Sequence, residues 1–192
     1  MHKDLPINPY QKNILHLDKP IKINYISQGT ITVNNKNEYE YKNALSESSL
    51  IGIRRMCGFD ILQGKESISI LKRNLIGSHY YSKDMTITYT TSLFRKKKPR
   101  SFIVKIGHLY LVNKEPLYNA ENMSYSLNFN GRVTVPSVKN FQLIHPTDKT
   151  YIILTFGKVG DNTYVMDYKY PLSAVKAFSI CLAALDNKYF CD

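Results

Sequence analysis

The chain has 192 residues, of which 43% are hydrophobic and 21% are charged, as is ordinary for a soluble globular domain. These values exclude a wholly disordered chain, a collagen-like chain and a protein with many membrane spans. The 26 Lys and Arg residues outnumber the 15 Asp and Glu residues and leave a formal net charge of +11, which favours an anionic partner, either nucleic acid or an acidic membrane surface. We expect residues 1–192 to form one domain.

Segments with the two-residue period of β-strands follow one another as far as residue 170. They are residues 21–25, 30–33, 38–41, 68–72, 86–91, 101–106, 125–129 and 163–170, and residues 151–156 form a further expected strand that is apolar on both faces. The polar cluster at 34–37 predicts one hairpin turn, and the basic run at 95–100 predicts the tip of another. Residues 44–50 fit either a loop or a short helix. Strands at this spacing predict an antiparallel sandwich or barrel.

Residues 172–185 break this pattern, because past Lys176 every residue is apolar or small. A helix without a polar face lies either in a protein core or in lipid. This one would be roughly 20 Å long, shorter than the ~30 Å hydrocarbon layer of a membrane. We therefore expect a buried core helix, with Pro171 in its first turn and Asn187 just past its end. A lone buried helix after many strands fits the lumen of a closed barrel.

The cysteines and the first residues indicate a compartment. Cys57, Cys181 and Cys191 form no Cys-x-x-Cys pair, so we expect neither a disulfide framework nor a zinc site. Reduced thiols in a cytosolic protein are the simplest interpretation. Residues 1–6 lack the apolar stretch of a secretory leader and the motif for myristoylation. Any membrane contact is therefore expected to be peripheral.

Several stretches share motifs with one known family. These are FNGRVTVPSVKNFQ at 129–142, AFSICLAALDNKYFCD at 177–192, residues 151–171, NKEPLYN at 113–119 and KRNLIG at 72–77. They resemble elements of the Tubby C-terminal domain family, and the first two are similar to its two signatures. Pro136 stands where the family usually has Ala. The resemblance extends from about residue 70 to 192 and does not include residues 1–65.

This resemblance implies a closed antiparallel β-barrel of about twelve strands around a hydrophobic C-terminal α-helix. It also implies binding of phosphatidylinositol phosphates, chiefly phosphatidylinositol 4,5-bisphosphate, at the acidic inner leaflet of the plasma membrane. The corresponding role is that of a membrane tether or trafficking adaptor with membrane-receptor cargo, which in animal relatives travels into cilia. We expect a cytoplasmic monomer at the plasma membrane, with the cilium and the nucleus as further locations, and no cofactor.

The family takes its headgroup contacts from a basic-x-basic pair just before an Asn-Leu-x-Gly turn. Lys72 matches the second basic position, whereas the first falls on Ile70. Arg73 is an additional cation on the opposite strand face, and Asn74 begins the turn. Lys83 stands in for a basic residue that the family carries in the next loop. The alternative is that these residues form an ordinary solvated strand end.

The basic run at 95–100 contributes Lys96, Lys98 and Arg100 to the candidate phosphoinositide ligands. We expect Arg100, beside the rigid Pro99, to be the selective member. The run also fits a solvated hairpin tip, a nuclear signal or a nucleic-acid contact. A basic nuclear or nucleic-acid-binding regulator is therefore an alternative, although no RNP-like aromatic platform or basic recognition helix is visible. A third alternative, given Ile70, is a scaffold of the same fold whose lipid site has decayed.

Arg132, Lys139 and Asn140 lie inside the first signature. We expect them to tie strands together, with Asp167 or Asp192 as partners, because a buried cation without a partner is costly. No pair of histidines has the spacing of a metal site. The sequence also lacks a complete P-loop and a nucleophile elbow, so we expect neither a metal site nor enzymatic activity.

Overall fold

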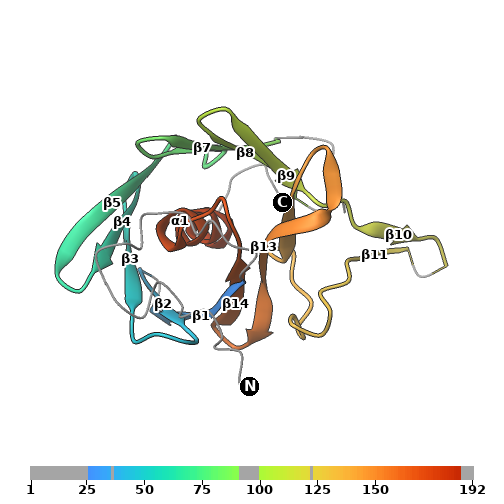
Figure 1. The fold of residues 1–192 in the computed structure, drawn as a ribbon, viewed down its shortest axis with the longest axis horizontal. Helices are drawn as coiled ribbons and strands as arrows, with labels where there is room; N and C mark the ends of the chain where they lie inside the picture. Colours follow the sequence, from blue (N-terminus) through green and yellow to red (C-terminus); the bar gives the residue numbers. More distant parts are fainter. Residues whose placement is uncertain (1–25, 36, 91–99, 122, 187–192) are drawn as a thin grey trace, which may run out of the picture.

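The computed structural model describes residues 26–35, 37–90, 100–121 and 123–186. Within these ranges the chain forms a closed barrel of antiparallel strands around one helix (Figure 1). The elements are β1 (Ser27–Asn35), β2 (Glu38–Asn43), β3 (Ser49–Arg55), β4 (Gly58–Gln63), β5 (Glu66–Arg73), β6 (His79–Tyr81), β7 (Met85–Tyr89), β8 (Phe102–Ile106), β9 (Leu109–Asn113), β10 (Leu117–Asn119), β11 (Ser124–Ser126), β12 (Phe141–His145), β13 (Asp148–Gly160), β14 (Thr163–Tyr168) and α1 (Ala174–Leu185).

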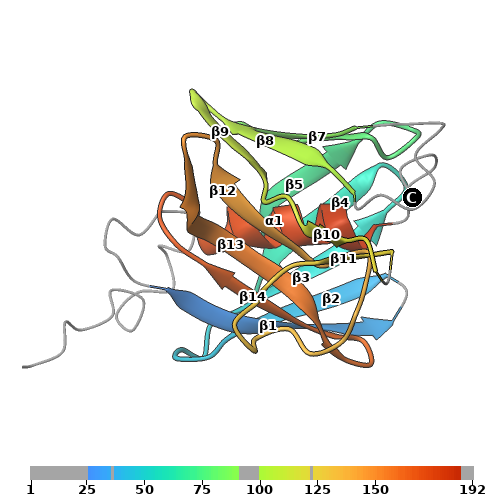
Figure 2. The same cartoon turned by 90° about the vertical axis from the view of Figure 1, so that its right-hand side faces the viewer.

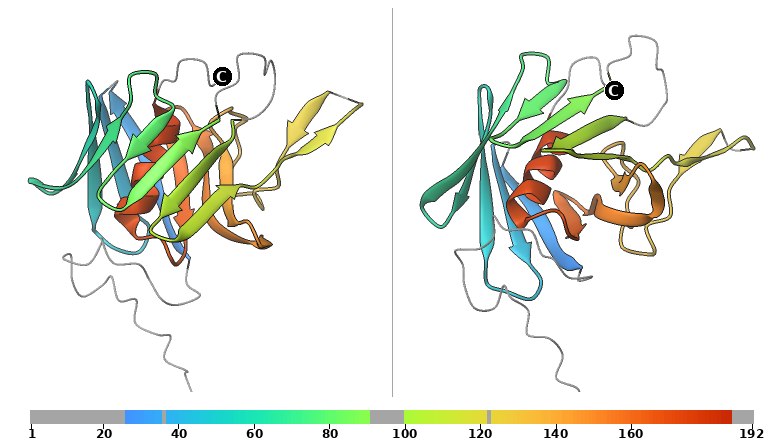
Figure 3. Two further views of the ribbon diagram at one scale, coloured as in Figure 1. Left: turned by 90° about the horizontal axis from the view of Figure 1, so that it is seen from above. Right: turned by 45° about the horizontal axis from the view of Figure 1, so that its top comes forward.

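The ring of strands closes on itself. Its order is β1-β14-β13-β12-β9-β8-β7-β6-β5-β4-β3-β2, and β1 pairs with both β2 and β14. The barrel alternative of the sequence analysis is thereby confirmed, because a sandwich would leave two separate sheets. β10 and β11 stand outside the ring, where they pair with each other as a hairpin that projects from the barrel (Figure 3).

The two-residue period decides which side chains face the lumen. In β7, Met85, Ile87 and Tyr89 are buried, whereas Thr86 is exposed. Both expected hairpins are confirmed, since β1 pairs with β2 and β7 pairs with β8. Of the segment 44–50, residues 44–47 form a bend and Ser49 and Leu50 begin β3, so the loop alternative holds and no helix forms. Residues 21–25 lie outside the described residues. The strand expected at 125–129 is shorter, because only Ser124–Ser126 pairs, in the projecting hairpin.

Helix α1 fills the lumen, as the absence of a polar face predicts. Figure 1 shows it inside the ring of strands, and Figure 2 shows it running through the barrel. The side chain of Ser173 caps its N-terminus by accepting a hydrogen bond from the Lys176 N–H. Lys176 is half-buried and forms an ion pair with Asp84 at 2.6 Å. The helix begins later than expected, so Pro171 lies ahead of the cap. The expected end residue, Asn187, is outside the described residues.

The fit between helix and barrel depends on a small residue in the wall. Gly52 of β3 faces the helix, and a Cβ atom there would lie 2.8 Å from Leu182 Cδ1. On the same side, Phe178 packs against Tyr41 with ring centroids 6.0 Å apart. Phe178 and Leu182 have no exposed surface. The barrel is therefore a packed core and not a pore.

Candidate functional site

The outer face of the barrel carries a row of polar and aromatic side chains that begins at β5. Directly paired residues of antiparallel strands point to the same face. The register joins Lys72 to Tyr81, Tyr81 to Thr86, Thr86 to Lys105, and Lys105 to Tyr110. Lys105 Nζ lies 5.4 Å from the centroid of the Tyr110 ring, a cation–π contact. We call these five residues the outer row.

Arg55 extends this row by one cation. In the β3–β4 hairpin Arg55 pairs with Gly58, and on the other side Gly58 pairs with Lys72. Arg55 and Lys72 therefore flank a glycine on the same outer face, on the order of 10 Å apart between their Cα atoms. Gly58 has a φ of 137°, and a Cβ atom there would lie 1.9 Å from the Leu71 carbonyl oxygen. The positive φ and this close approach favour glycine at this position, so no side chain lies between the two cations.

The position where the resemblance implied a second cation is apolar and exposed. Ile70 lies on the outer face with 51% of its surface exposed and pairs with Asp60 of β4. Asp60 in turn accepts a hydrogen bond from Arg55 Nε at 2.7 Å. An Arg55–Asp60 ion pair from neighbouring strands thus lies beside Ile70, where the resemblance implied a cation. Sequence reasoning missed Arg55, because only the register of β3, β4 and β5 places it beside Lys72.

Lys72 and Arg73 point to opposite faces, as the strand period predicts. Lys72 is exposed on the outer row. The Arg73 side chain is only 16% exposed and lies 3.5 Å from Asp186, measured from Nε to Oδ2. Its Nη2 atom also donates to the Met56 carbonyl oxygen at 3.2 Å. The structure therefore places the two predicted headgroup residues in different environments.

Asp186, which directly follows helix α1, is the centre of a buried polar cluster. Its side chain has no exposed surface. It is paired with Arg54 and Arg73 and accepts a hydrogen bond from the Tyr80 hydroxyl at 2.8 Å. Burial, followed by the nearby Asp186 charge, raises the pKa of Tyr80 well above its ordinary value. This cluster anchors the end of the helix to β3, β5 and β6.

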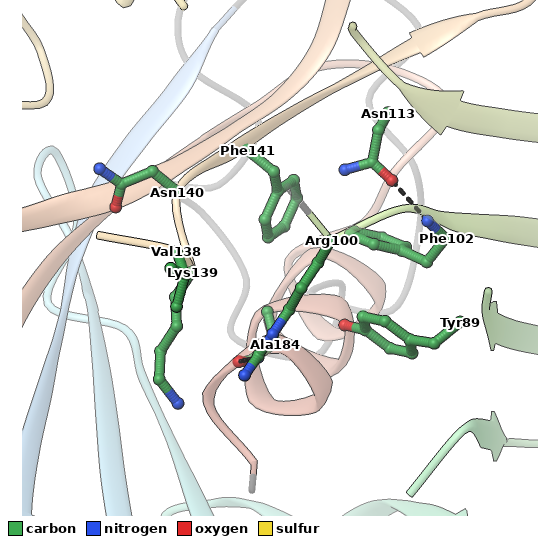
Figure 4. Close-up of a pocket in the computed structure, with 9 residues that line it drawn as sticks. All are labelled: Tyr89, Arg100, Phe102, Asn113, Val138, Lys139, Asn140, Phe141 and Ala184. Carbon is green, nitrogen blue, oxygen red and sulfur yellow. Dashed lines mark hydrogen bonds between the residues drawn. The ribbon is translucent and has the colours of Figure 1, made fainter. Parts of the chain in front are cut away.

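Two further cations meet the same end of the helix. Arg100 Nη1 donates to the Ala184 carbonyl oxygen at 3.2 Å, and Lys139 Nζ donates to the Leu185 carbonyl oxygen at 2.8 Å. Carbonyls of the last helical turn have no partner within the helix and carry the negative end of its dipole. Figure 4 shows both cations directed at this end, in a small pocket that also includes Tyr89. Arg100 therefore supports the helix in this structure.

Asn74 and Lys83 hold different positions near Lys72. Asn74 Oδ1 accepts hydrogen bonds from the N–H groups of Ser78 and His79 at 2.9 and 3.1 Å, so its side chain shapes the β5–β6 turn. Lys83 is exposed in the turn between β6 and β7. Lys96 and Lys98 lie outside the described residues, and so does most of the basic run.

The expectation that the first signature ties strands together is confirmed for Arg132 and Asn140, whereas Lys139 contacts the end of helix α1. Arg132 donates two hydrogen bonds of 2.7 Å to the Asp167 carboxylate, one from Nε and one from Nη2. Asn140 donates to the Val135 carbonyl oxygen and accepts from the Lys158 N–H. These residues join the 129–140 segment to β13 and β14. The other partner that we expected, Asp192, lies outside the described residues.

The described part of the chain has neither a metal-binding cluster nor a membrane-spanning helix. No group of three or more His, Cys, Asp or Glu side chains in this part of the chain is arranged to hold a metal ion. None of the helices there is both long and apolar enough to span a membrane.

Comparison with known proteins adds two findings. The chain matches the Tub family over residues 2–187. Proteins named "Protein king tubby" from Drosophila sechellia, Drosophila yakuba and Drosophila grimshawi are each 51% identical to it over 82 residues. That alignment covers 43% of this chain but only 18% of each of these relatives, so the chain matches less than a fifth of their length.

Proposed function

This chain belongs to the Tub family, and from that membership we propose that it is a phosphoinositide-binding domain, not an enzyme, that acts at the surface of a membrane. The observation that carries the proposal is the pair of cations, Arg55 and Lys72, on either side of Gly58 on the outer face. Lys72 occupies the position that the family resemblance assigns to headgroup contact, and its side chain is exposed. Phosphatidylinositol 4,5-bisphosphate is the favoured headgroup.

The positions of the cations support different roles for them in this proposal. Arg55 and Lys72 point outward on neighbouring strands, where the phosphates of one headgroup can bridge them. Lys83, in the adjacent turn, is the third cation of this proposed site. Lys105 lies three strand spacings from Lys72, on the order of 14 Å. That distance suits a neighbouring acidic lipid better than the same headgroup.

Arg73, Asn74 and Arg100 have a supporting role in this proposal. The side chains of Arg73 and Arg100 are directed at Asp186 and at the end of helix α1, and Asn74 shapes the turn beside Lys72. In this way they stabilise the strands and turns around the proposed site.

The expected affinity is modest. Each Lys or Arg close to an acidic membrane surface contributes about 1 kcal/mol. Three such cations therefore raise binding about a hundredfold over a neutral surface. This is suited to reversible recruitment. The proposed role is accordingly a tether or trafficking adaptor at the cytoplasmic face of the plasma membrane, with membrane receptors as cargo.

Vesicle co-sedimentation tests the proposal. The protein is mixed with phosphatidylcholine vesicles that contain each phosphoinositide in turn or an equal charge of phosphatidylserine. We expect the strongest binding to the 4,5-bisphosphate, and a loss of about tenfold or more in a variant with both Arg55→Gln and Lys72→Gln. The control is Lys65→Gln, because Lys65 is exposed at the opposite end of β5, roughly 23 Å from Lys72.

A competitor in the same assay tests the alternative function, which the net charge of +11 keeps open. Duplex DNA is added at physiological salt. If DNA binds more tightly than every vesicle, the lipid proposal is wrong and the nucleic-acid alternative replaces it. Equal losses in the Lys65 variant and in the double variant would also contradict the proposal, because they would show a charge effect without a site.

A further inference from the structure

Three apolar side chains are exposed at the ends of two turns beside the cation pair. Met56, in the β3–β4 turn, and Leu75, in the β5–β6 turn, are each 89% exposed, and the neighbouring Ile76 is 42% exposed. We call these three residues the apolar tip. Turns at the surface usually carry polar residues or glycine, and an exposed apolar cluster next to a binding site indicates a partner that covers it.

The two turns are held side by side by Arg73. Its backbone N–H donates to the Cys57 carbonyl oxygen at 2.9 Å, and its side chain donates to the Met56 carbonyl oxygen at 3.2 Å. On the other turn, Asn74 accepts from Ser78 and His79, which fixes the loop that presents Leu75. The apolar tip is thus built on a preorganised frame, so little conformational entropy is lost when a partner covers it.

The charges around the apolar tip identify that partner. Arg55 is adjacent to Met56 in the chain, and Lys72 lies on the strand that leads to Leu75. Both cations point outward. Apolar side chains at a tip with cations set just behind them match the layers of an acidic bilayer, in which phosphates lie above the acyl chains.

We propose that the apolar tip inserts into the headgroup–acyl boundary of an acidic membrane while Arg55 and Lys72 hold the phosphates above it. This inference rests on the proposed function and adds an orientation to it. The end of the barrel with the β3–β4 and β5–β6 turns faces the bilayer, and the end of helix α1 that is anchored through Asp186 faces it too. Binding of the protein to such a membrane then depends both on the charge of the headgroups and on burial of the apolar tip.

The projecting hairpin offers a matched comparison. Leu117 and Met123 are 77% and 78% exposed, so they are as accessible as the apolar tip. Their flanking charged residues include Glu115 and Glu121, which an acidic membrane repels. Changes at Leu117 and Met123 therefore control for the loss of exposed apolar surface in general.

Fluorescence measures insertion directly, since the chain has no tryptophan. Leu75→Trp and, as the control, Leu117→Trp each introduce a single one. Vesicles contain phosphatidylinositol 4,5-bisphosphate in phosphatidylcholine with brominated acyl chains, which quench tryptophan only at short range. We expect a blue shift and quenching for Leu75→Trp and no change for Leu117→Trp. An unquenched Leu75→Trp on vesicles that bind the protein would overturn the inference.

A binding experiment separates insertion from headgroup recognition. The Met56→Ser, Leu75→Ser double variant should bind vesicles about tenfold or more weakly, yet bind soluble inositol 1,4,5-trisphosphate as the unmodified protein does. The Arg55→Gln, Lys72→Gln variant should lose both, and Leu117→Ser with Met123→Ser should lose neither. Full vesicle binding by the apolar-tip variant would refute insertion and leave the proposed function standing. Failure of the unmodified protein to bind either probe would refute both.

Discussion

At the scale of single residues, cations that are neighbours in the sequence lie in different environments. Lys72 and Arg73 are neighbours in the chain, but one is exposed and the other pairs with a fully buried carboxylate. Arg54 and Arg55 differ in the same way, because Arg54 pairs with Asp186 and Arg55 points outward. The inward member of each pair supports the fold through Asp186, whereas the outward member is exposed, and Arg55 also pairs with Asp60 at 2.7 Å.

The buried carboxylate of Asp186 should therefore be critical for stability. We expect Asp186→Asn to lower the free energy of unfolding by about 3 kcal/mol, because it leaves Arg54 and Arg73 without their counter-charge. Urea unfolding followed by circular dichroism measures this. Asp161→Asn is the control, since the Asp161 side chain is fully exposed. Equal stability of the two variants would show that the cluster contributes nothing.

Buried tyrosines should make the fold sensitive to base. Burial raises the pKa of Tyr41 and of Tyr80 above the ordinary 10.0. At high pH these hydroxyls ionise more readily in the unfolded chain, so their contribution to stability is constant below about pH 10 and falls above it. The slope is up to about 1.4 kcal/mol per pH unit for each tyrosine.

Urea unfolding at a series of pH values, with tyrosinate absorbance as a second signal, checks this expectation. Tyr41→Phe should reduce the slope. Tyr118→Phe, on the projecting hairpin, should not change it, because Tyr118 is 55% exposed. A slope that does not depend on Tyr41 would contradict the explanation.

At the scale of elements, helix α1 and the barrel depend on each other. The helix has no polar face to expose to water, so it has to be buried. The inward side chains of the strands in turn need the helix to pack against. Ser173 satisfies one end of the helix, and Arg100 and Lys139 satisfy the carbonyls at the other. The projecting hairpin is independent of this core, since it pairs only within itself.

A charge on the buried face of the helix should prevent folding. Phe178 has no exposed surface and packs on Tyr41, so Phe178→Asp would bury a carboxylate without a partner. We expect no cooperative unfolding transition and no dispersed amide spectrum by NMR. Phe178→Leu, which keeps the site apolar, should fold with a stability loss of about 1 kcal/mol. A folded Phe178→Asp protein would show that the helix can leave the barrel.

At the scale of the whole molecule, the net charge of +11 adds a long-range attraction to any acidic surface. This attraction differs from headgroup contact in its response to salt, because exposed charges are screened over about 8 Å at physiological ionic strength. In our proposal the cation pair and the apolar tip act at short range, and the general charge acts before contact.

The basic run at 95–100 should belong to the long-range part. Replacing Lys96, Lys97 and Lys98 by Gln is expected to weaken binding to phosphatidylserine and phosphoinositide vesicles equally, and the loss should fade as salt rises. Co-sedimentation at several salt concentrations measures it. A loss confined to phosphoinositides that persists in high salt would assign these lysines to the headgroup instead.

Elements whose patterns are local can be predicted from the sequence alone. Residues 172–185 are apolar on every side and therefore have to be buried, which predicts a helix enclosed by strands. The alternation along 68–72 predicts that Leu71 faces inward and Lys72 outward. Continued by one residue, it turns Arg73 inward. The resemblance to the Tubby C-terminal domain family located Lys72 and the turn after it.

Which distant residues lie next to each other follows from the folded structure and not from local sequence. Arg54 meets Asp186, 132 positions further along the chain, and Arg55 stands beside Lys72 because two hairpins set the register across Gly58. No local pattern encodes such pairings, since they follow from how the strands pair and how the ring closes around the helix. Closure is also the physical reason that Arg73 and Arg100 support the helix end, while Arg55 and Lys72 point outward, where we propose that they contact an anionic headgroup.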